Sequence, residues 1–391
     1  MQVTDDLVRS VVQRVLAQIS APSGSSASAV KAGSDGIFSD VESAVAASVA
    51  AQRAFERRGL EDRRKALACI RKICLERADE LGRDEMEETK IGRLPHKIEK
   101  LKLIADRIPG VEFLKTDVFS GENGITLQEY APFGVIGAIT PVTHSLPTLA
   151  CNAINMLASG NSLIVNAHPS GVKICKGVKL FNQAIRAAIG IDNLITIIDK
   201  PTLETAQAIF DHRDVRMLCV TGGPAVGRAA LRSPKRAVVA GPGNPPVVVD
   251  ETADIDNAAR CIIAGAAYDN NLLCIGEKEV FAVAAIFEEL MEAMSRHKAV
   301  RLNAAQVDAL TKIAFSPSED KKYMVPTKEF IGQDAAFLAA KIGLSIPLDT
   351  ELLYGETDES NPFVPTEQMM TFVPFVKTRD VDSAIELAKK H

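Results

Sequence analysis

The chain has 391 residues, of which 47% are hydrophobic and 24% charged, and its formal net charge is -5. This length predicts two or three domains with substantial cores, and the mild acidity without a basic block argues against a nucleic-acid or anionic-membrane partner. No apolar stretch approaches the roughly 20 residues that a membrane span needs. The seven cysteines form neither close pairs nor a cluster with histidines, which predicts a reduced intracellular compartment and no metal site.

The first twenty residues are predicted to form an amphipathic helix. Thr4 is a suitable N-cap, and Leu7, Val11 and Val15 belong to an apolar stripe at helical spacing. Residues 21–35 are rich in Ser, Ala and Gly, a composition typical of a flexible linker. A short helix on such a linker cannot bury its apolar stripe locally, so we expect it to dock on another protein, on its own chain or on a sister subunit.

Residues 40–108 contain charged, alanine-rich periodic segments that are typical of helices. The segment 111–130 then predicts a β-hairpin, because two strand-like runs flank Gly-Glu-Asn-Gly at 121–124, and Asn-Gly is a strong hairpin signal. A two-stranded ribbon is marginally stable alone. We therefore expect the hairpin to pack on a neighbouring domain or subunit.

Alternating strands and helices follow Ala131. Four short runs are typical of buried strands, and helical segments separate them. The expected strands are 135–140, 162–166, 194–198 and 216–220. This alternation predicts a doubly wound parallel sheet, and a second α/β region is expected to begin near residue 245 and to run to the end of the chain.

A glycine-rich turn joins the last of these strands to the following helix. It contains Thr221, Gly222, Gly223, Pro224 and Gly227. Glycines allow the close approach of a phosphate, and a helix N-terminus supplies free N–H donors and positive potential. The turn departs from the GxGxxG pattern, and similar turns are common without a ligand. These residues alone therefore leave both nucleotide binding and a purely structural turn open.

Cys274 differs from the other six cysteines in its surroundings. Polar residues and a glycine flank it in the run Asp-Asn-Asn-Leu-Leu-Cys-Ile-Gly-Glu at 269–277, as expected for a turn near a cleft. A thiolate there would attack a carbonyl carbon, and its backbone N–H would stabilise the oxyanion. A small buried hydrophobic residue is the alternative. The remaining cysteines lie in apolar periodic segments and are assigned to packing: Cys69, Cys74, Cys151, Cys175, Cys219 and Cys261.

Five segments, in this order, resemble the CoA-acylating branch of the aldehyde dehydrogenase superfamily, and most of all the propionaldehyde dehydrogenases of propanediol-degrading bacterial microcompartments. They are APFGVIGAITPVTHSLPT (131–148), SGNSLIVNAHPSG (159–171), TGGPAVGR (221–228), AGPGNPPVVVDETADID (240–256) and DNNLLCIGEKEV (269–280). The resemblance covers residues 40–391. It implies an α/β aldehyde dehydrogenase fold with a Rossmann-like NAD-binding domain (36–246), an α/β catalytic domain (247–391) and the hairpin 111–130 as a small oligomerisation element.

The resemblance also implies the residues of the site. Cys274 matches the nucleophile. His144 takes the place of a side-chain amide that assists the oxyanion, and a surface-loop histidine without that role is the alternative. Glu367 matches the carboxylate that holds the nicotinamide ribose, and an exposed glutamate without a role is the alternative. The other expected cofactor contacts are Thr140, Pro141, His168, Thr221, Gly222, Gly223 and Gly227.

Two departures from the family pattern bear on the reaction. Ala240 stands where hydrolytic relatives carry a glutamate that activates water, and alanine cannot act as a base. Coenzyme A brings a thiol that ionises near neutral pH, so thiolysis is favoured over hydrolysis. Gly171 stands where an acidic residue often faces the adenosine ribose, which leaves the preference for NAD over NADP open.

The implied reaction is the oxidation of a short-chain aldehyde to acyl-CoA with reduction of NAD, through a thioester on Cys274. Propanal is the expected substrate, and acetaldehyde is the next choice. The helix at 4–19 is expected to bind a microcompartment shell protein, which places the protein as a homo-oligomer in the lumen of a bacterial microcompartment within the cytoplasm. The chain ends at His391 in a helical pattern without a C-cap glycine, which predicts an incomplete catalytic domain. A non-catalytic member of the family is the alternative function.

Overall fold

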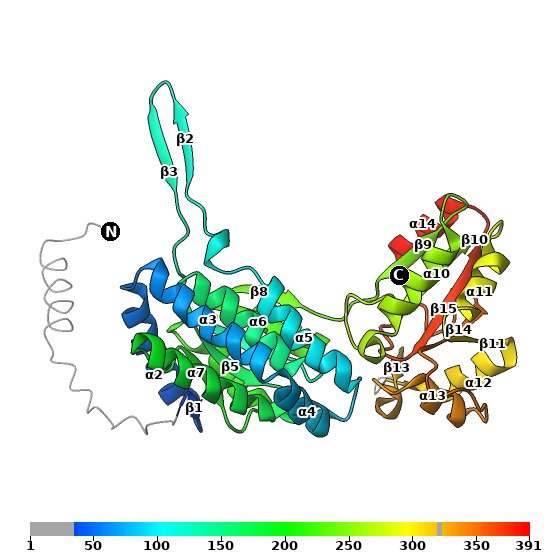
Figure 1. The fold of residues 1–391 in the computed structure, drawn as a ribbon, viewed down its shortest axis with the longest axis horizontal. Coiled ribbons are helices and arrows are strands. Elements are labelled where there is room, and N and C mark those ends of the chain that lie inside the picture. The colour runs from blue at the N-terminus through cyan, green and yellow to red at the C-terminus, as the bar shows by residue number, and fades with distance from the viewer. Residues whose placement is uncertain (1–34, 319–322) are drawn as a thin grey trace, which may run out of the picture. The chain divides into compact units, whose positions relative to one another are not determined.

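The computed structural model describes residues 35–318 and 323–391 (Figure 1). The predicted helix at 1–20 and all of the predicted linker except Asp35 lie outside the described residues. Asp35 itself is anchored, because its Oδ2 accepts a hydrogen bond from Gln183 Nε2 at 2.8 Å and its Oδ1 lies 3.1 Å from Arg186 Nη1. We call residues 35–240 the N-terminal lobe and residues 246–391 the C-terminal lobe.

The N-terminal lobe is built on a six-stranded sheet in which every pair of neighbouring strands is parallel. The order is β1-β6-β5-β4-β7-β8. The strands are β1 (Ile37–Phe38), β4 (Val135–Thr140), β5 (Ser162–Ala167), β6 (Ile195–Ile198), β7 (Val215–Thr221) and β8 (Arg236–Ala240). The four predicted strands are confirmed, and every boundary agrees to within one residue. Long apolar runs between helices are typical of strands buried on both faces, which is why these strands could be predicted.

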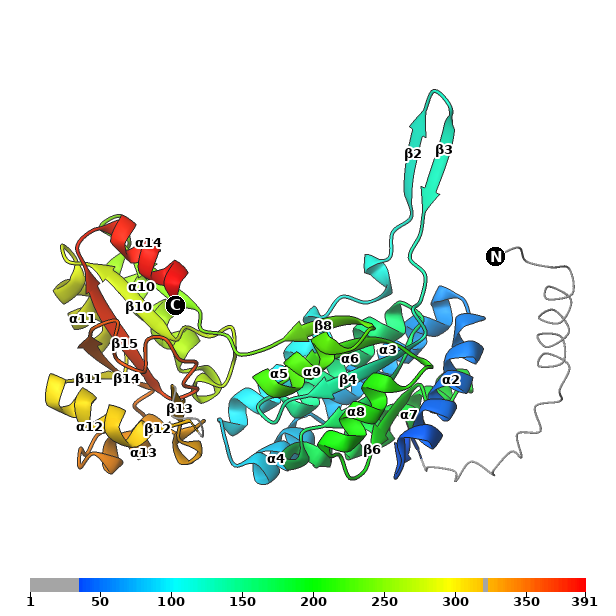
Figure 2. The same ribbon diagram turned by 180° about the vertical axis from the view of Figure 1, so that it is seen from behind.

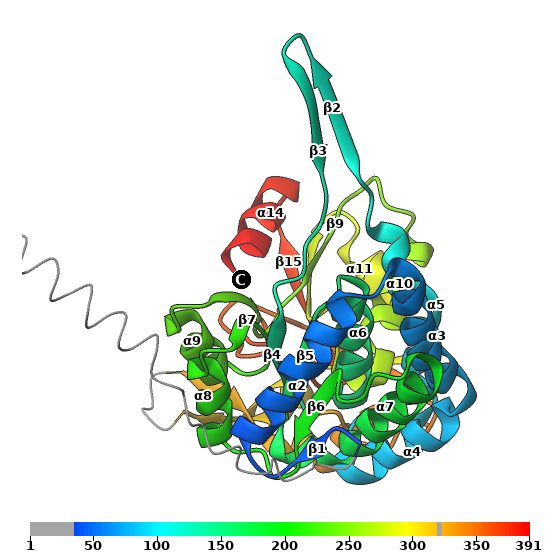
Figure 3. The same ribbon diagram turned by 90° about the vertical axis from the view of Figure 1, so that its left-hand side faces the viewer.

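Helices cover both faces of this sheet (Figure 3). One apolar cluster joins one face to helices α6 (Ser145–Ala158), α7 (Cys175–Ile189) and α3 (Leu60–Glu76). A second cluster joins the other face to α2 (Val41–Glu56), α8 (Leu203–Asp211) and α9 (Pro224–Arg232). Successive strand residues alternate between the clusters: Leu163 and Val165 join the first, and Ile164 joins the second. The predicted helical region 40–108 is completed by α4 (Ala78–Thr89) and α5 (Leu94–Arg107).

A two-stranded antiparallel ribbon projects from the N-terminal lobe (Figure 1). It consists of β2 (Asp117–Gly121) and β3 (Gly124–Gln128), and a short 3-10 helix, Val111–Phe113, precedes it. The hairpin prediction is confirmed, with a two-residue turn between Gly121 and Gly124. Every residue of both strands is exposed, including apolar ones: Val118, Phe119, Ile125 and Leu127.

The C-terminal lobe contains a second, five-stranded parallel sheet in the order β11-β14-β15-β10-β9 (Figure 2). Its strands are β9 (Pro246–Val249), β10 (Glu279–Val283), β11 (Ala299–Leu302), β14 (Leu352–Thr357) and β15 (Phe372–Thr378). Helices α10 (Ile255–Ala266) and α11 (Phe287–Ser295) share one core cluster with it, and α12 (Ala304–Ala314), α13 (Ala335–Lys341) and α14 (Val381–Lys390) belong to two others. A small antiparallel pair, β12 (Phe315–Pro317) and β13 (Met324–Pro326), lies beside them.

The connection between the sheets runs through residues 241–245, because β8 belongs to the first sheet and β9 to the second. One packing prediction is wrong. Cys261 is exposed on α10, and its Sγ lies 3.8 Å from Asn257 Oδ1 of the preceding turn. The helix buries Ala259, Ile262 and Ile263 instead, so the apolar neighbours of Cys261 in the sequence lie on another face.

Candidate active site

A cavity of about 540 Å³ lies where the strands β4, β5, β7 and β8 end. Its wall includes the last residue of each of these strands: Thr140, Ala167, Thr221 and Ala240. Ligands of open α/β sheets bind beyond the carboxyl ends of the strands, where loops and helix N-termini converge. Nine of the ten residues that were expected in the site line this one cavity: Thr140, Pro141, His144, His168, Thr221, Gly222, Gly223, Cys274 and Glu367.

The cofactor-side wall is made largely of backbone. Gly223 is the N-cap of α9 and Pro224 begins the helix, so the first-turn N–H groups of α9 face the region of Gly222 and Gly223 without a side chain between. A Cβ added at Gly223 would meet no atom within 4 Å. Gly227 is the expected site residue that the cavity wall does not include. It is buried in α9, where an added Cβ would lie 3.1 Å from Val239 of β8.

Thr140 supplies a polar group that the described residues leave unused. Its side chain is 1% exposed, and its Oγ1 has no hydrogen-bond partner within residues 35–318 and 323–391. A buried hydroxyl without a partner is costly unless a ligand or water satisfies it. The neighbouring backbone is fixed, because His168 N donates to the Thr140 carbonyl at 3.0 Å. His168 is exposed, and its Nδ1 accepts from Ser170 N at 3.1 Å.

Cys274 lies on the opposite wall, at the end of a loop with an uncommon backbone. Asp269, Asn270 and Asn271 have φ values of 48°, 56° and 64°, so three consecutive non-glycine residues are in the left-handed region. Asp and Asn tolerate this region better than other residues with a Cβ, but each such residue still carries strain that the surroundings must offset. Cys274 itself is half-buried.

Glycines let neighbouring segments pack directly on this loop. A Cβ at Gly243, in the connection between the sheets, would overlap the carbonyl oxygen of Cys274, and one at Gly92 would overlap the carboxylate of Asp269. Gly92 also needs its glycine for conformational reasons, because its φ is 84°. Gly243 was not among the expected site residues, although it lies in the segment 240–256 that carries the family resemblance.

Lys278 holds the loop from within the C-terminal lobe. It is fully buried, and its Nζ donates to Asn271 O at 2.8 Å, Asn271 Oδ1 at 2.6 Å and Leu273 O at 2.8 Å. Burial lowers the pKa of Lys278 to about 8, and the negative charge of Glu367 is the largest influence that opposes the shift. The ammonium group therefore supplies both three hydrogen bonds and a positive charge behind the cysteine.

Glu367 is half-buried on the cavity wall. Burial raises the pKa of its carboxyl group, and the Gly243 backbone N–H and the Lys278 charge oppose the rise. The glutamate is therefore not the freely exposed residue of the alternative interpretation.

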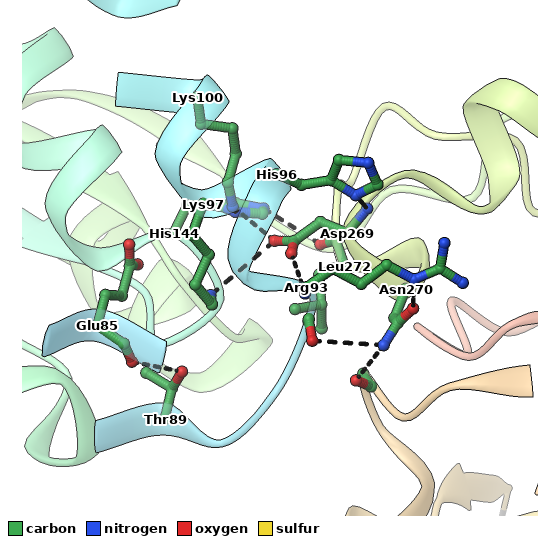
Figure 4. A network of polar contacts seen from close by, with 12 residues as sticks. Glu85, Thr89, Arg93, His96, Lys97, Lys100, His144, Asp269, Asn270 and Leu272 are labelled. Atoms are coloured by element: carbon green, nitrogen blue, oxygen red, sulfur yellow. Dashed lines mark hydrogen bonds and ion pairs between the residues drawn. The ribbon is translucent and has the colours of Figure 1, made fainter. Parts of the chain in front are cut away.

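His144 bridges the two lobes (Figure 4). Its Nδ1 lies 3.1 Å from Lys100 Nζ, and its Nε2 lies 3.2 Å from the carbonyl oxygen of Leu272, two residues before Cys274. Lys100 also donates to Asp269 Oδ2 at 2.6 Å. Burial and the nearby positive charge of Lys100 lower the pKa of His144 to about 3, so the imidazole stays neutral at physiological pH.

Sequence reasoning missed the lysines of this site. Lys97 and Lys100 lie on the buried face of α5 with Leu101 and Ala105. A signal was available, because positions 97, 101 and 105 are one helical face, and a lysine within an apolar face needs a buried partner. The partner, Asp269, is 169 residues away in sequence from Lys100 and could not be found from the helix alone.

Comparison with known proteins identifies the class. Residues 18–326 match the model of the aldehyde dehydrogenase family. The chain belongs to this family, and the predicted fold class is confirmed. Within residues 35–318 and 323–391, no group of three His, Cys, Asp or Glu side chains is placed to hold a metal ion, and no helix is long and apolar enough to cross a membrane.

Its relatives include CoA-acylating members of the family. The acetylating acetaldehyde dehydrogenase EutE of Salmonella typhimurium is 40% identical over 355 residues, which are 90% of this chain and 76% of that protein. A propionaldehyde dehydrogenase from the Clostridium phytofermentans fucose utilisation microcompartment is 39% identical, with a TM-score of 0.86 over 90% of this chain and 80% of that one. The Rhodopseudomonas palustris propionaldehyde dehydrogenase, with bound CoA and an acylated cysteine, is 39% identical, with a TM-score of 0.87 over 92% of this chain and 81% of that one. The predicted resemblance to the acylating branch is confirmed.

Proposed function

We propose that this chain oxidises a short-chain aldehyde to its acyl-CoA, with NAD as the hydride acceptor and Cys274 as the nucleophile. The observation that carries the proposal is the cavity itself, which places Cys274 on one wall and the glycine-rich N-terminus of α9 on the other. A thiol nucleophile beside a site for a pyrophosphate is what an aldehyde dehydrogenase requires. The similarity to relatives that are acetylating or propionaldehyde dehydrogenases supports the reaction type.

The residues of the cofactor-side wall fit a dinucleotide. The unpartnered Thr140 Oγ1 offers a hydroxyl to the nicotinamide side, together with Pro141. Thr221, Gly222 and Gly223 leave room for a pyrophosphate at the start of α9, and His168, which also lines the cavity, is the proposed contact of the adenosine ribose. When bound, NAD supplies the acceptor for the hydride of the substrate.

Cys274 would act first as a nucleophile and later as a leaving group. Its thiolate adds to the aldehyde carbon, and the Cys274 backbone N–H stabilises the oxyanion of the thiohemiacetal. Loss of hydride leaves a thioester on Cys274. The thiolate of coenzyme A then attacks that thioester, and Cys274 departs as a thiolate while acyl-CoA forms. Each bond that forms is matched by one that breaks, and the attack of the coenzyme A thiolate on the thioester requires no external base.

Hydrolysis of the thioester by water is the competing outcome, and it needs a residue that activates water. Ala240 on the cavity wall cannot activate water, but Glu367 lines the same cavity and carries a carboxyl group of the kind that acts as a general base. By the family resemblance Glu367 instead matches the carboxylate that holds the nicotinamide ribose, and that is the role we propose for it. Thiolysis is therefore the proposed route.

The test measures NADH formation from propanal with and without coenzyme A, in the wild type, in Cys274→Ala and in Cys261→Ala. The last variant is a matched control, because Cys261 is an exposed cysteine on α10, outside the cavity. Turnover that needs both CoA and Cys274, and that survives the loss of Cys261, supports the proposal. CoA-independent production of free acid would instead establish hydrolysis, and Glu367→Gln would then abolish it. Full activity of Cys274→Ala would remove the proposed nucleophile.

Propanal is the proposed substrate, because the two similar solved structures described above are propionaldehyde dehydrogenases. Acetaldehyde is the second candidate, since EutE is an acetylating enzyme. One methylene in an apolar pocket is worth about 10-fold or more in kcat/KM. A ratio of kcat/KM for propanal to acetaldehyde below one would reverse the assignment.

The same proposal places the protein in a bacterial microcompartment, since a similar enzyme comes from one. Residues 4–19 would bind a shell protein, and the exposed apolar residues of β2 and β3 would be covered in a homo-oligomer. Two measurements test these parts separately. Fusion of residues 1–20 to a fluorescent protein should direct it into microcompartments, and Ile125→Asp should lower the oligomeric state in sedimentation. A diffuse reporter or an unchanged oligomer would contradict the respective part.

A further inference from the structure

The loop that carries Cys274 needs contacts that offset its strain. Asp269, Asn270 and Asn271 are all left-handed, and such a conformation persists only where the surroundings determine it. Lys278 provides contacts on the C-terminal side, at Asn271 and Leu273. Leu272 lies between these two residues, two positions before Cys274, and neither of these Lys278 contacts reaches it.

Asp269 is the first anchor on the other side. Its carboxylate is fully buried, with Oδ2 at 2.6 Å from Lys100 Nζ and 4.0 Å from Lys97 Nζ, and Oδ1 accepts from Arg93 N at 2.7 Å. Its own N–H donates to His96 Nδ1 at 2.8 Å. Burial would raise the pKa of Asp269, but the ammonium groups of Lys100 and Lys97 and the Arg93 N–H hold it below its ordinary value. The carboxylate is therefore ionised and paired with α5.

The same ammonium group determines the tautomer of His144. A lysine ammonium can only donate, so His144 Nδ1, at 3.1 Å, must accept. A neutral imidazole with an accepting Nδ1 carries its proton on Nε2, and that proton points at the Leu272 carbonyl oxygen 3.2 Å away. The assignment follows from the chemistry of the two partners. It also means that the His144 N–H is already used and does not point at a substrate oxyanion.

We propose that Lys100 is a positioning residue for Cys274, acting through His144. Its ammonium group joins Asp269 to His144, His144 donates to the Leu272 carbonyl, and the two contacts together set the loop that presents the thiol to the cavity (Figure 4). The inference rests on the proposed function, because it takes Cys274 as the nucleophile. It assigns His144 a positioning role instead of the oxyanion contact that the resemblance implies.

A double-mutant cycle tests whether Lys100 acts through His144. We expect His144→Ala to lower kcat by about 100-fold, because a misplacement of about 1 Å costs that much. Lys100→Met should lose at least as much, because it also removes the Asp269 contact, and the double variant should lose no more than Lys100→Met, since the His144 link is already broken there. Losses that multiply would overturn the proposal. Lys102→Met is the matched control, because Lys102 is on the same helix, is exposed, and within the described residues forms an ion pair with Asp79 alone, at 4.0 Å.

Loss of Lys100 alone leaves the buried Asp269 carboxylate with weaker compensation, so Lys100→Met can also lower stability. The pair Lys100→Met with Asp269→Asn removes both members of the 2.6 Å ion pair, so no Asp269 carboxylate is left without this lysine, while the link to His144 stays broken. Activity is therefore compared per folded protein. Wild-type kcat in this pair, or in His144→Ala, would overturn the proposal, whatever the melting temperatures.

Alkylation by iodoacetamide separates positioning from oxyanion stabilisation. The alkylation displaces iodide at a saturated carbon and forms no oxyanion, so its rate reports the access and ionisation of the thiol and is independent of oxyanion stabilisation. We expect the rate at Cys274, followed by mass spectrometry of its peptide, to fall about 10-fold in His144→Ala, while the exposed Cys261 in the same molecule reacts at the wild-type rate. Lost turnover with an unchanged or faster rate at Cys274 would return His144 to the oxyanion role. Turnover that survives Cys274→Ala would instead remove the proposed function, a distinct result.

Discussion

The two walls of the cavity are constructed in different ways. The part of the cofactor-side wall proposed to hold the pyrophosphate, Thr221 to Val226, is a strand end, two glycines and a helix start, and this part comes from one short stretch of chain. The wall that bears Cys274 is held by the side chains of Lys100 on α5, of His144 at the N-cap of α6 and of Lys278 just before β10, and it packs on the backbone of Gly243. A backbone-built site tolerates change around it, because its geometry is local. A site held by buried side chains that are distant in sequence is sensitive to any change in the packing that aligns them.

The largest expected effect comes from Gly243→Ala. An added Cβ would overlap the Cys274 carbonyl oxygen, and a backbone atom cannot move aside as a flexible side chain can. We expect kcat to fall by about 100-fold or more. Gly59→Ala is the control, because a Cβ there meets nothing within 4 Å. A Gly243→Ala enzyme with near wild-type kcat would show that the loop adapts, and that the two walls differ less than proposed.

The second effect is on stability, at Asn271. Its Nδ2 donates to Ala266 O at 2.8 Å and Glu277 O at 2.9 Å, and its φ is 64°. Asn271→Ala loses these bonds and strains a Cβ in the left-handed region, which together cost about 3 kcal/mol of unfolding free energy. Asn271→Gly relieves the strain and should recover about 1 kcal/mol. Urea unfolding of the three proteins measures both values. Equal stability of the Ala and Gly variants would mean that the backbone there is not strained.

The third prediction concerns the cofactor-side wall. Gly223→Ala should fold normally, because its φ is -64° and a Cβ has open space, but the methyl group would enter the approach to the start of α9. We expect KM for NAD to rise about 10-fold, a loss of about 1.4 kcal/mol of binding. Iodoacetamide should label Cys274 at the wild-type rate. Changed labelling would show that the two walls are coupled.

The last prediction concerns a pH dependence of stability at Glu279, the first residue of β10. Burial raises the pKa of Glu279 to about 8 from an ordinary value of 4.5. The folded state therefore retains a proton that the unfolded chain releases. Its contribution to stability is fully present below about pH 4.5, declines as pH rises and is lost above about pH 8.

Glu279→Gln should remove this decline, because the amide does not titrate. Between pH 5 and pH 9, the melting temperature should therefore fall less for the variant than for the wild type. The variant should be the more stable protein at pH 9. Parallel curves for the two proteins would exclude a retained proton on Glu279.

The sequence alone determined the elements whose signals are local. Alternation of apolar runs with helical segments predicted the parallel sheet of the N-terminal lobe, Gly-Glu-Asn-Gly predicted the hairpin, and the flanking residues singled out Cys274. Even the three left-handed residues had a local cue, since Asp-Asn-Asn is the composition that best tolerates positive φ.

Only the tertiary structure decided what holds the nucleophile. Lys100 meets Asp269 across 169 residues of sequence, and His144 meets Leu272 across 128. The sequence around a lysine or an aspartate does not identify its partner, because an ion pair forms between the charges that the packing of the two lobes brings together. The role of Gly227 was likewise decided by packing, since a glycine in a phosphate-binding pattern and a glycine that lets a helix approach a strand look the same until the strand is in place.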